Sequence, residues 1–357
     1  MRKSRIEDLH EYFSEKAHSS FWESFNHERH TFLTQPINTP SPVTTSERGE
    51  LFSLLLRLHP TEVGEVAPGA GNQVQAAFLD MVRQGDADLA RWLHTPNQRR
   101  PYTLGLLQGF NHISAQQMEE IMAKNQTVQV TPGQVYWLRI TMLDATVFGS
   151  FAQYLITNSR TLTVRIGDAR FEISRLLSTP EAGNTTQSWA AYSSFAELRA
   201  ASKAQKQYHF QFATPTAFSL GQKQWGKLLK VFPEPSAVFE SLARQWDIFA
   251  PASLRMASAN LTPHHMNAWC EEYVIVSRYS LETRYLPSSK FGLTGFCGDV
   301  HYEVKGSPAA PEALWLSSLA RFALFAGVGY KTTMGMGQTR CTNLLSEAGG
   351  QNRYESE

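Results

Sequence analysis

A glycine-rich run near the C-terminus is the segment of this sequence best suited to binding an anion. Residues 327–340 read GVGYKTTMGMGQTR, so two G-x-G pairs enclose a basic turn that carries hydroxyl groups. Glycine tolerates positive φ and, because it has no Cβ, lets main-chain N–H groups approach a ligand closely. The residues expected to contribute are Gly327, Gly329, Lys331, Thr332, Thr333, Gly335, Gly337 and Arg340. The run predicts a phosphate-binding loop, with nucleic acid or a nucleotide as the first ligand to consider.

Two familiar nucleotide motifs do not match this run. A dinucleotide fingerprint needs a strand before the glycines and a helix after them, but residues 312–326 show a helical spacing of apolar residues. A Walker A loop needs Gly directly before Lys and Thr, and Tyr330 stands there instead. The simplest alternative is that Gly327 only caps the preceding helix. Four glycines exceed what one cap needs, which favours a binding role.

Two clusters of basic residues are further candidates for contacts to a nucleic acid. Arg165 and Arg170 flank a Gly-Asp turn, and three lysines lie about a helical turn apart around Trp225. The three are Lys223, Lys227 and Lys230. An aromatic ring among lysines can stack on a base. The alternative for both clusters is a solvated helix face or hairpin.

The sequence predicts no metal site and no cofactor. The adjacent pair His264 and His265 would point apart on a regular element, and no third ligand is suitably spaced, so we interpret it as a solvated loop. Cys270, Cys297 and Cys341 contain no C-x-x-C pair, so we expect small buried side chains rather than disulfides or a zinc site. No paired carboxylates have a metal-binding spacing.

Length and composition indicate a globular protein. The 357 residues have room for two domains, and a hydrophobic fraction of 42% with 11% aromatic residues can bury a sizeable core. No apolar run reaches 18 residues and the N-terminus lacks the apolar core of a signal peptide, so we expect a cytoplasmic protein with no membrane partner.

The net charge of +1 is unevenly distributed along the chain. Residues 48–345 carry 27 basic and 22 acidic side chains, a net charge of +5, whereas residues 1–47 and 346–357 each have a net charge of −2. A modestly basic centre is typical of a protein that grips a defined RNA or DNA site through local phosphate contacts. Many ordinary enzymes have the same balance.

The order of expected elements repeats in the two halves of the chain. The first half predicts a strand at 51–58, helices at 72–82 and 86–94, strands at 102–107 and 134–143, a helix at 145–158 and a strand at 162–174. The second half predicts a strand at 208–212, a helix at 237–249, strands near 273–280 and 299–304, a helix at 312–326 and a strand at 337–344. Both follow the βαββαβ order of the ferredoxin-like fold, which RNA-recognition modules also use.

The predicted fold class is therefore α+β, with tandem ferredoxin-like domains. We expect an N-terminal extension and linker at 1–47, a first domain at 48–178, a connector with a short helix at 179–205, a second domain at 206–345 and an acidic tail at 346–357.

Three segments resemble the CRISPR-associated repeat endoribonucleases of the Cas-six family, in the RAMP superfamily. The glycine-rich run is the most specific, and residues 212–218 (FATPTAF) and 295–300 (GFCGDV) support it. The resemblance extends over about residues 50–345. It implies two ferredoxin-like domains in a prokaryotic cytoplasmic protein that binds the repeat of a precursor CRISPR RNA, cuts it once without metal and retains the mature RNA. Subunits of a CRISPR effector complex are further implied partners.

The same resemblance implies a catalytic histidine in the first domain. Residues 88–94 (DLARWLH) and 100–103 (RPYT) are similar to the family segment that ends a helix with His and resumes in a strand after a basic residue. His94 is then the candidate general base or acid, because imidazole titrates near neutrality. Metal-free cleavage requires a deprotonated 2′-hydroxyl, a protonated leaving 5′-oxygen and stabilised phosphorane charge. The products would carry a 2′,3′-cyclic phosphate and a 5′-hydroxyl.

The chain departs from the family pattern around this histidine. Many members add a Tyr on the preceding helix and a Lys after the His, whereas here apolar residues stand at the Tyr position and the basic residues are Arg99 and Arg100. Arginine keeps its proton, so these two are expected to stabilise charge. Tyr102 or Lys331 is then the candidate acid. Otherwise His94 would serve both steps in a slow, single-turnover enzyme.

Alternatives stay open on sequence grounds. A lone His at a helix end is often only a partner of the helix dipole. His59, beside Pro60 at the end of the first strand, is the second candidate catalyst because we expect it close to the same site. The whole protein could also be a non-catalytic repeat-binding subunit of an effector complex, or an RNA-recognition protein unrelated to CRISPR.

Overall fold

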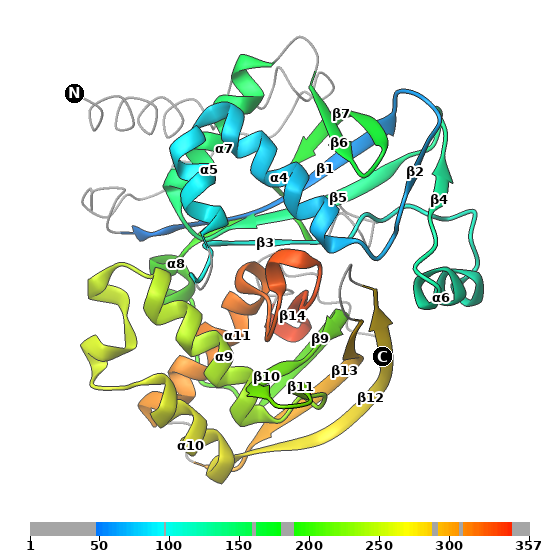
Figure 1. Ribbon diagram of the computed structural model, residues 1–357. Coiled ribbons are helices and arrows are strands. Elements are labelled where there is room, and N and C mark those ends of the chain that lie inside the picture. The colour runs from blue at the N-terminus through cyan, green and yellow to red at the C-terminus, as the bar shows by residue number, and fades with distance from the viewer. Residues whose placement is uncertain are drawn as a thin grey trace, which may run out of the picture.

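The computed structural model of the chain describes residues 48–95, 98–158, 162–179, 189–287, 292–306 and 310–344. Within them, two large antiparallel sheets lie one above the other in Figure 1, each packed against its own helices. The helix and linker expected in residues 1–47 and the acidic tail expected at 346–357 lie outside the described residues, as does the central part of the connector, 180–188.

The first sheet is built around β1 (Glu50–Pro60), whose apolar run is buried along most of its length. The strand order is β3-β5-β1-β7-β6, with β8 also paired to β1. The other strands are β3 (Tyr102–Leu104), β5 (Tyr136–Met142), β6 (Thr163–Ile166), β7 (Ala169–Leu177) and β8 (Ala191–Ser194). The helices are α4 (Gly71–Gly85), α5 (Ala87–His94) and α7 (Ala145–Thr157). Phe78 of α4 packs on Phe151 of α7, which joins the helix layer to the core.

The second sheet has the strand order β12-β13-β9-β14. Its strands are β9 (Gln207–Thr216), β12 (Val274–Leu286), β13 (Leu293–Val304) and β14 (Thr339–Cys341). The covering helices are α9 (Pro235–Phe249) and α11 (Pro311–Ala326), which meet where Trp246 contacts Phe322 and Trp315 edge to face. In both sheets the first main strand lies between the third and the fourth, and the second lies at the edge beside the third. This shared order confirms the tandem ferredoxin-like fold.

The two domains are joined at the C-terminal end of α11. The last carbonyls of a helix have no partner within the helix, and here side chains of β5 supply partners. Arg139 donates to Leu324 O, and the Thr141 hydroxyl donates to Phe325 O at 2.7 Å. The positive charge of Arg139 at this end also complements the helix dipole. The glycine-rich loop starts directly after α11, so its first residue is held on the sheet of the first domain.

One sequence interpretation in the second domain was wrong. His264 and His265 are not in a loop: they belong to α10 (Pro263–Tyr273), which Thr262 caps by accepting a hydrogen bond from His265 N. A Thr cap followed by Pro at the first helical position is a start signal that we did not use. For the lysines around Trp225 the sequence left a helix face or a hairpin open, and the structure shows the hairpin of β10 (Phe218–Lys223) and β11 (Gly226–Lys230).

Other elements were not expected from the sequence. A small two-stranded sheet joins β2 (Gly64–Val66) to β4 (Val128–Val130), and α6 (Ala115–Ala123) precedes β4. The last strand is also shorter than expected, since β14 is followed by the 3-10 turn η5 (Thr342–Leu344).

Candidate functional site

The glycine-rich loop has the unusual backbone that its sequence predicts. All four glycines have positive φ, between 63° and 90°, and Lys331 shares this region with φ of 55°. A Cβ at Gly337 would overlap Val328 O, and one at Gly329 would overlap Ala217 O. The glycines are therefore required both by their φ angles and by close packing of the loop on itself and on the second domain.

Most of the glycine amides bond within the protein. Gly327 N donates to Ala323 O, Gly329 N to the Ser241 hydroxyl and Gly337 N to Pro215 O, each at 3.0 Å. These N–H groups are therefore already used, and a ligand would meet the side chains of the turn instead. The turn contains Lys331 and the 3-10 segment η4 (Thr332–Met334). All of its residues are partly exposed.

The turn lies directly against the first domain. A Cβ at Gly71, the first residue of α4, would overlap Met334 O, so the backbones of α4 and η4 touch. One turn further along α4, Gln75 Nε2 donates to Thr333 Oγ1 and to Tyr102 Oη, both at 3.1 Å. The glycine loop is thus a shared element of both domains.

The expected catalytic histidine lies at the exposed end of α5. Asp86 caps this short helix by accepting hydrogen bonds from Asp88 N and Leu89 N at 3.0 Å, and His94 is its last residue. Arg100 Nε donates to Leu93 O at 2.6 Å, which satisfies a carbonyl at the end of the same helix. Arg100 therefore holds the turn that presents His94.

The charge of Arg99 is influenced by the second domain. Partial burial, and next the guanidinium of Arg244 on α9, lower the pKa of Arg99. The same helix holds the glycine loop, since Gln245 donates to Gly327 O at 3.2 Å. Arg244 is itself paired with Glu240 at 2.6 Å, one turn away. A polyanion at this boundary would relieve the repulsion between Arg99 and Arg244.

Tyr102 is completely buried on β3. Its ring packs on Phe78, and burial raises the pKa of its hydroxyl, while the hydrogen bond from Gln75 and the charge of Arg100 act in the opposite direction. This hydroxyl does not meet solvent, whereas Lys331, the other candidate acid, is partly exposed in the turn. The hydrogen bonds Tyr102–Gln75–Thr333 connect β3 to the glycine loop, and the charge of Arg100, which is bonded to the end of α5, acts on the Tyr102 hydroxyl. Figure 1 shows β3 and the loop after α11 adjacent at the boundary between the domains.

His59 does not lie near this group, which corrects our expectation. Along β1, Leu56 and Leu58 face the helix-covered core, so the alternating His59 points to the opposite face of the sheet. Its cross-strand partner is Glu172 on β7. Burial and Arg57 lower the pKa of His59 while Glu172 raises it. The residue of β1 that is level with Tyr102 of β3 is Phe52, because both are aligned with Met142 of β5. His59 lies seven residues further along β1, which is about 23 Å at 3.3 Å per residue.

The other residues predicted to contact a nucleic acid do not lie together. Lys227 lies against the loop, with Nζ donating to Tyr330 Oη at 3.1 Å and 4.2 Å from the ring centroid. Lys223 is exposed on the same hairpin, near Trp225, which is 72% exposed at the tip. Arg165 and Arg170 face each other across the β6–β7 hairpin, where Arg165 pairs with Asp168 at 3.3 Å.

Arg340 belongs to a different surface from the turn. Its guanidinium donates to Gln211 on β9 at 2.9 Å and lies 4.4 Å from the ring centroid of Trp189. Burial lowers the pKa of Arg340, and Asp299 raises it. Sequence reasoning missed Gln75 and Arg244, because the partners that matter for the site, Thr333 and Arg99, are more than 100 residues away from them.

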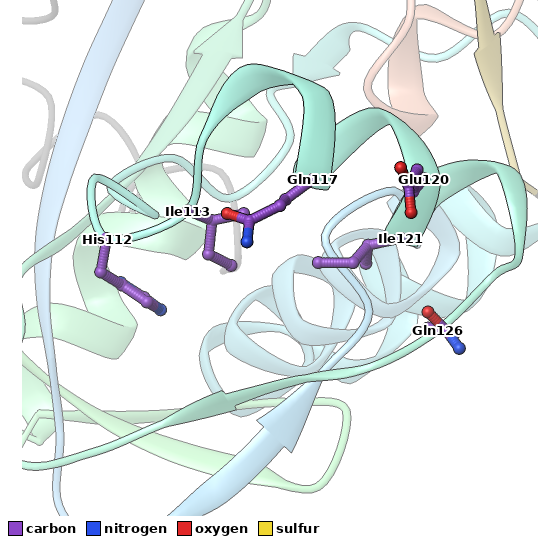
Figure 2. A pocket seen from close by; sticks show the side chains of 6 residues that line it. All are labelled: His112, Ile113, Gln117, Glu120, Ile121 and Gln126. Carbon is purple, nitrogen blue, oxygen red and sulfur yellow. The ribbon is translucent and has the colours of Figure 1, made fainter.

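A depression of about 290 Å³ lies beside α6 (Figure 2). Its lining is formed by His112, Ile113, Gln117, Glu120, Ile121 and Gln126. Gln117 is already engaged in the cap of α6 with Ser114. None of the residues discussed above lines this depression, so it is separate from the boundary site.

No described helix combines the length and apolar character needed to cross a membrane. Likewise, the described residues contain no group of three or more His, Cys, Asp or Glu side chains that could hold a metal ion.

The fold and the loop define the class of this protein: it has two ferredoxin-like domains in tandem, with a basic, glycine-rich loop after the last helix. Family comparison agrees, because residues 51–200 match the CRISPR Cas6 N-terminal domain and residues 210–339 match CRISPR-associated endoribonuclease Cas6. The chain belongs to the Cas6 family.

Curated relatives are distant. The chain is 25% identical over 126 residues to the CRISPR-associated endoribonuclease Cas6 of Streptococcus thermophilus, covering 35% of this chain and 46% of that protein. It is 27% identical over 152 residues to that of Mycobacterium tuberculosis, covering 43% and 44%. The matches thus span about half the length of these relatives.

Solved structures match over more of the chain. A Cas6 product complex superposes with a TM-score of 0.64 at 22% identity, covering 81% of this chain and 99% of the other. Thermus thermophilus Cas6 gives 0.56 at 22%, covering 82% and 98%. A Cas6 substrate mimic complex gives 0.54 at 26%, covering 82% and 99%.

Proposed function

We propose that this protein is an endoribonuclease that cuts precursor CRISPR RNA within the repeat and keeps the mature RNA bound. Family membership supports this, as do the Cas6 relatives described as endoribonucleases and the neighbours described as product and substrate mimic complexes. Three observations support the proposal: His94 is exposed at the end of α5, Arg244 of the second domain acts on the charge of Arg99, and the turn of the glycine loop packs against α4 of the first domain.

The chemistry that we propose assigns one role to each of these residues. His94 takes the proton from the 2′-hydroxyl, and the resulting oxyanion attacks the adjacent phosphorus while the bond to the 5′-oxygen breaks. Arg99 stabilises the extra negative charge of the phosphorane, since arginine stays protonated and donates several hydrogen bonds. Lys331 supplies a proton to the leaving oxygen. The products carry a 2′,3′-cyclic phosphate and a 5′-hydroxyl, and no metal takes part.

The remaining residues bind or position. Lys331, Thr332 and Thr333 face the RNA backbone, and Lys227 and Lys223 extend this basic surface along the β10–β11 hairpin, where Trp225 can stack on a base. Arg100 and Tyr102 act inside the protein, by holding the end of α5 and by contacting Gln75. Arg165, Arg170 and Arg340 would contact more distant parts of a long RNA.

The test uses the protein and its own repeat RNA in buffer with EDTA. We expect a single cut, with the cyclic phosphate and the 5′-hydroxyl identified by mass spectrometry of the fragments. A 2′-deoxy substitution at the cut nucleotide should abolish cleavage without loss of binding. Cleavage of that deoxy substrate would exclude 2′-hydroxyl attack. Retention of the mature RNA is tested by gel filtration after cutting. The fragment whose 3′ end is created by the cut should elute with the protein.

One observation favours a second function, that of a non-catalytic repeat-binding subunit. Tyr102 is buried and arginine keeps its proton, so neither Tyr102 nor Arg100 supplies an acid beside His94. A protein that binds the repeat tightly but leaves it intact over many hours in the same assay would establish this alternative.

A further inference from the structure

One side chain links the two domains at the glycine loop. Gln75, on α4, donates from the same Nε2 atom to Tyr102 Oη on β3 and to Thr333 Oγ1 on η4. The partners lie 27 and 258 residues away along the chain, on different domains. The two bonds fix the position of the turn relative to the strand that follows α5.

The direction of these hydrogen bonds determines where the Thr333 hydroxyl can donate its proton. A primary amide nitrogen donates two hydrogens and accepts none, so Thr333 Oγ1 accepts from Gln75 and keeps its own proton. Gln75 and Thr333 are both partly exposed, so that proton can be donated to a group on the surface of the turn. An ionised phosphate oxygen only accepts hydrogen bonds and is the complementary partner.

Close packing holds Gln75 in place. Because the backbones of Gly71 and Met334 touch, η4 cannot move away from α4 without opening the domain boundary. The Tyr102 hydroxyl, fixed in a buried ring, prevents the amide from rotating freely. Lys331, two residues before Thr333, adds the positive charge that draws a phosphate to this turn.

We infer that Gln75 is a positioning residue of the RNA site, which orients Thr333 so that its hydroxyl donates to a phosphate oxygen of the bound repeat. Gln75 does not touch the RNA itself. The inference rests on the proposed function in one respect, the identity of the ligand as repeat RNA. It does not depend on whether the RNA is cut.

The test measures the affinity for a repeat RNA with a 2′-deoxy nucleotide at the cut site, by fluorescence anisotropy. Gln75→Met, which has similar length and no hydrogen bonds, should weaken binding about fivefold, as expected for the loss of about one typical hydrogen bond. Thr333→Val should weaken it by a similar factor. Adding Gln75→Met to Thr333→Val should change affinity by less than about twofold, because the two residues act through one contact.

An isosteric variant separates positioning from packing. In Gln75→Glu the carboxylate accepts from both hydroxyls, so the Thr333 proton turns inward and a negative charge is added next to the RNA. We expect binding to weaken at least about tenfold although the shape is unchanged. Gln75→Met should leave the slope of log Kd against log salt unchanged, whereas Lys331→Ala should reduce it by about 0.7 to 0.9.

Three results would overturn the inference: wild-type affinity in both Gln75 variants, equal losses in Gln75→Met and Gln75→Glu, or fully additive effects of Gln75→Met and Thr333→Val. Cleavage of the normal repeat is scored separately. If wild-type protein binds but does not cut, the proposed enzyme function fails while the Gln75 result stands. If it cuts and the Gln75 variants bind normally, only the inference fails.

Discussion

Replacing Thr141 by Val tests how the domains are joined. The Thr141 hydroxyl is fully buried and takes part in three hydrogen bonds: it donates to Phe325 O at 2.7 Å, pairs with the Thr103 hydroxyl at 2.6 Å and accepts from Thr103 N at 3.1 Å. Valine has the same shape, so no cavity forms. The change leaves Phe325 O, Thr103 N and the Thr103 hydroxyl without this partner inside the interface.

The expected loss follows from these bonds. Each typical hydrogen bond contributes about 1 kcal/mol net, and burying a methyl in place of the hydroxyl returns part of the loss. We therefore expect the free energy of unfolding to fall by about 2 to 3 kcal/mol. Because Phe325 O lies two residues before Gly327, RNA affinity should fall as well.

The assay is urea unfolding followed by tryptophan fluorescence, with Thr283→Val as the matched control. Thr283 lies exposed on β12, and its change should stay within about 0.5 kcal/mol. The midpoint for Thr141→Val should fall with an unchanged slope. A loss below about 0.5 kcal/mol for Thr141→Val would refute the idea that these bonds hold α11 on the first sheet.

Three further predictions concern the glycine loop, α5 and the thiols. Gly337→Ala should cost about 1 to 2 kcal/mol for its φ of 73° alone, and its overlap with Val328 O should in addition reduce RNA binding in a filter assay. The control is Gly133→Ala, which has a similar backbone penalty at φ of 89° but open space around it, so RNA binding should stay unchanged. Asp86→Ala should destabilise the protein by about 1 kcal/mol in thermal unfolding and slow cleavage, because it removes the cap of the helix that presents His94; unchanged stability would contradict this. Burial raises the pKa of Cys341 to about 12 and that of Cys297 to about 11, so a maleimide reagent at pH 8 should label neither until urea unfolds the protein. Since the folded protein holds these protons more tightly, their contribution to stability is complete below pH 9 and is lost as the pH rises through 11 to 12.

The sequence was sufficient for elements with a strong local signal. The apolar spacing of α11 and the buried run of β1 identified both elements closely, and the order of such elements identified the fold. The α10 helix was missed although Thr262 and Pro263 mark its start, because its apolar periodicity is weak. Pairing between β2 and β4 joins residues about 64 positions apart, which no local pattern reveals.

The site was predictable only in part. The backbone of the glycine loop followed from its composition, but the use of its amides by Ser241, Pro215 and Ala323 depends on tertiary packing. Gln75 resembles any other polar residue on a helix until the fold brings Thr333 to it. His59 was misjudged because the sequence places it at a strand end without showing which face of the sheet it occupies.

The most direct measurement of the central claim is the single-turnover rate of repeat RNA cleavage in EDTA by His94→Ala, with His59→Ala as the matched control. His94→Ala should cut at least about a hundredfold more slowly, as expected for loss of a general base, while binding the repeat within about threefold of wild type. His59→Ala, on the other face of the sheet, should cut normally. If His94→Ala cuts at the wild-type rate, the imidazole at the end of α5 does not transfer the proton and the account of this site is wrong.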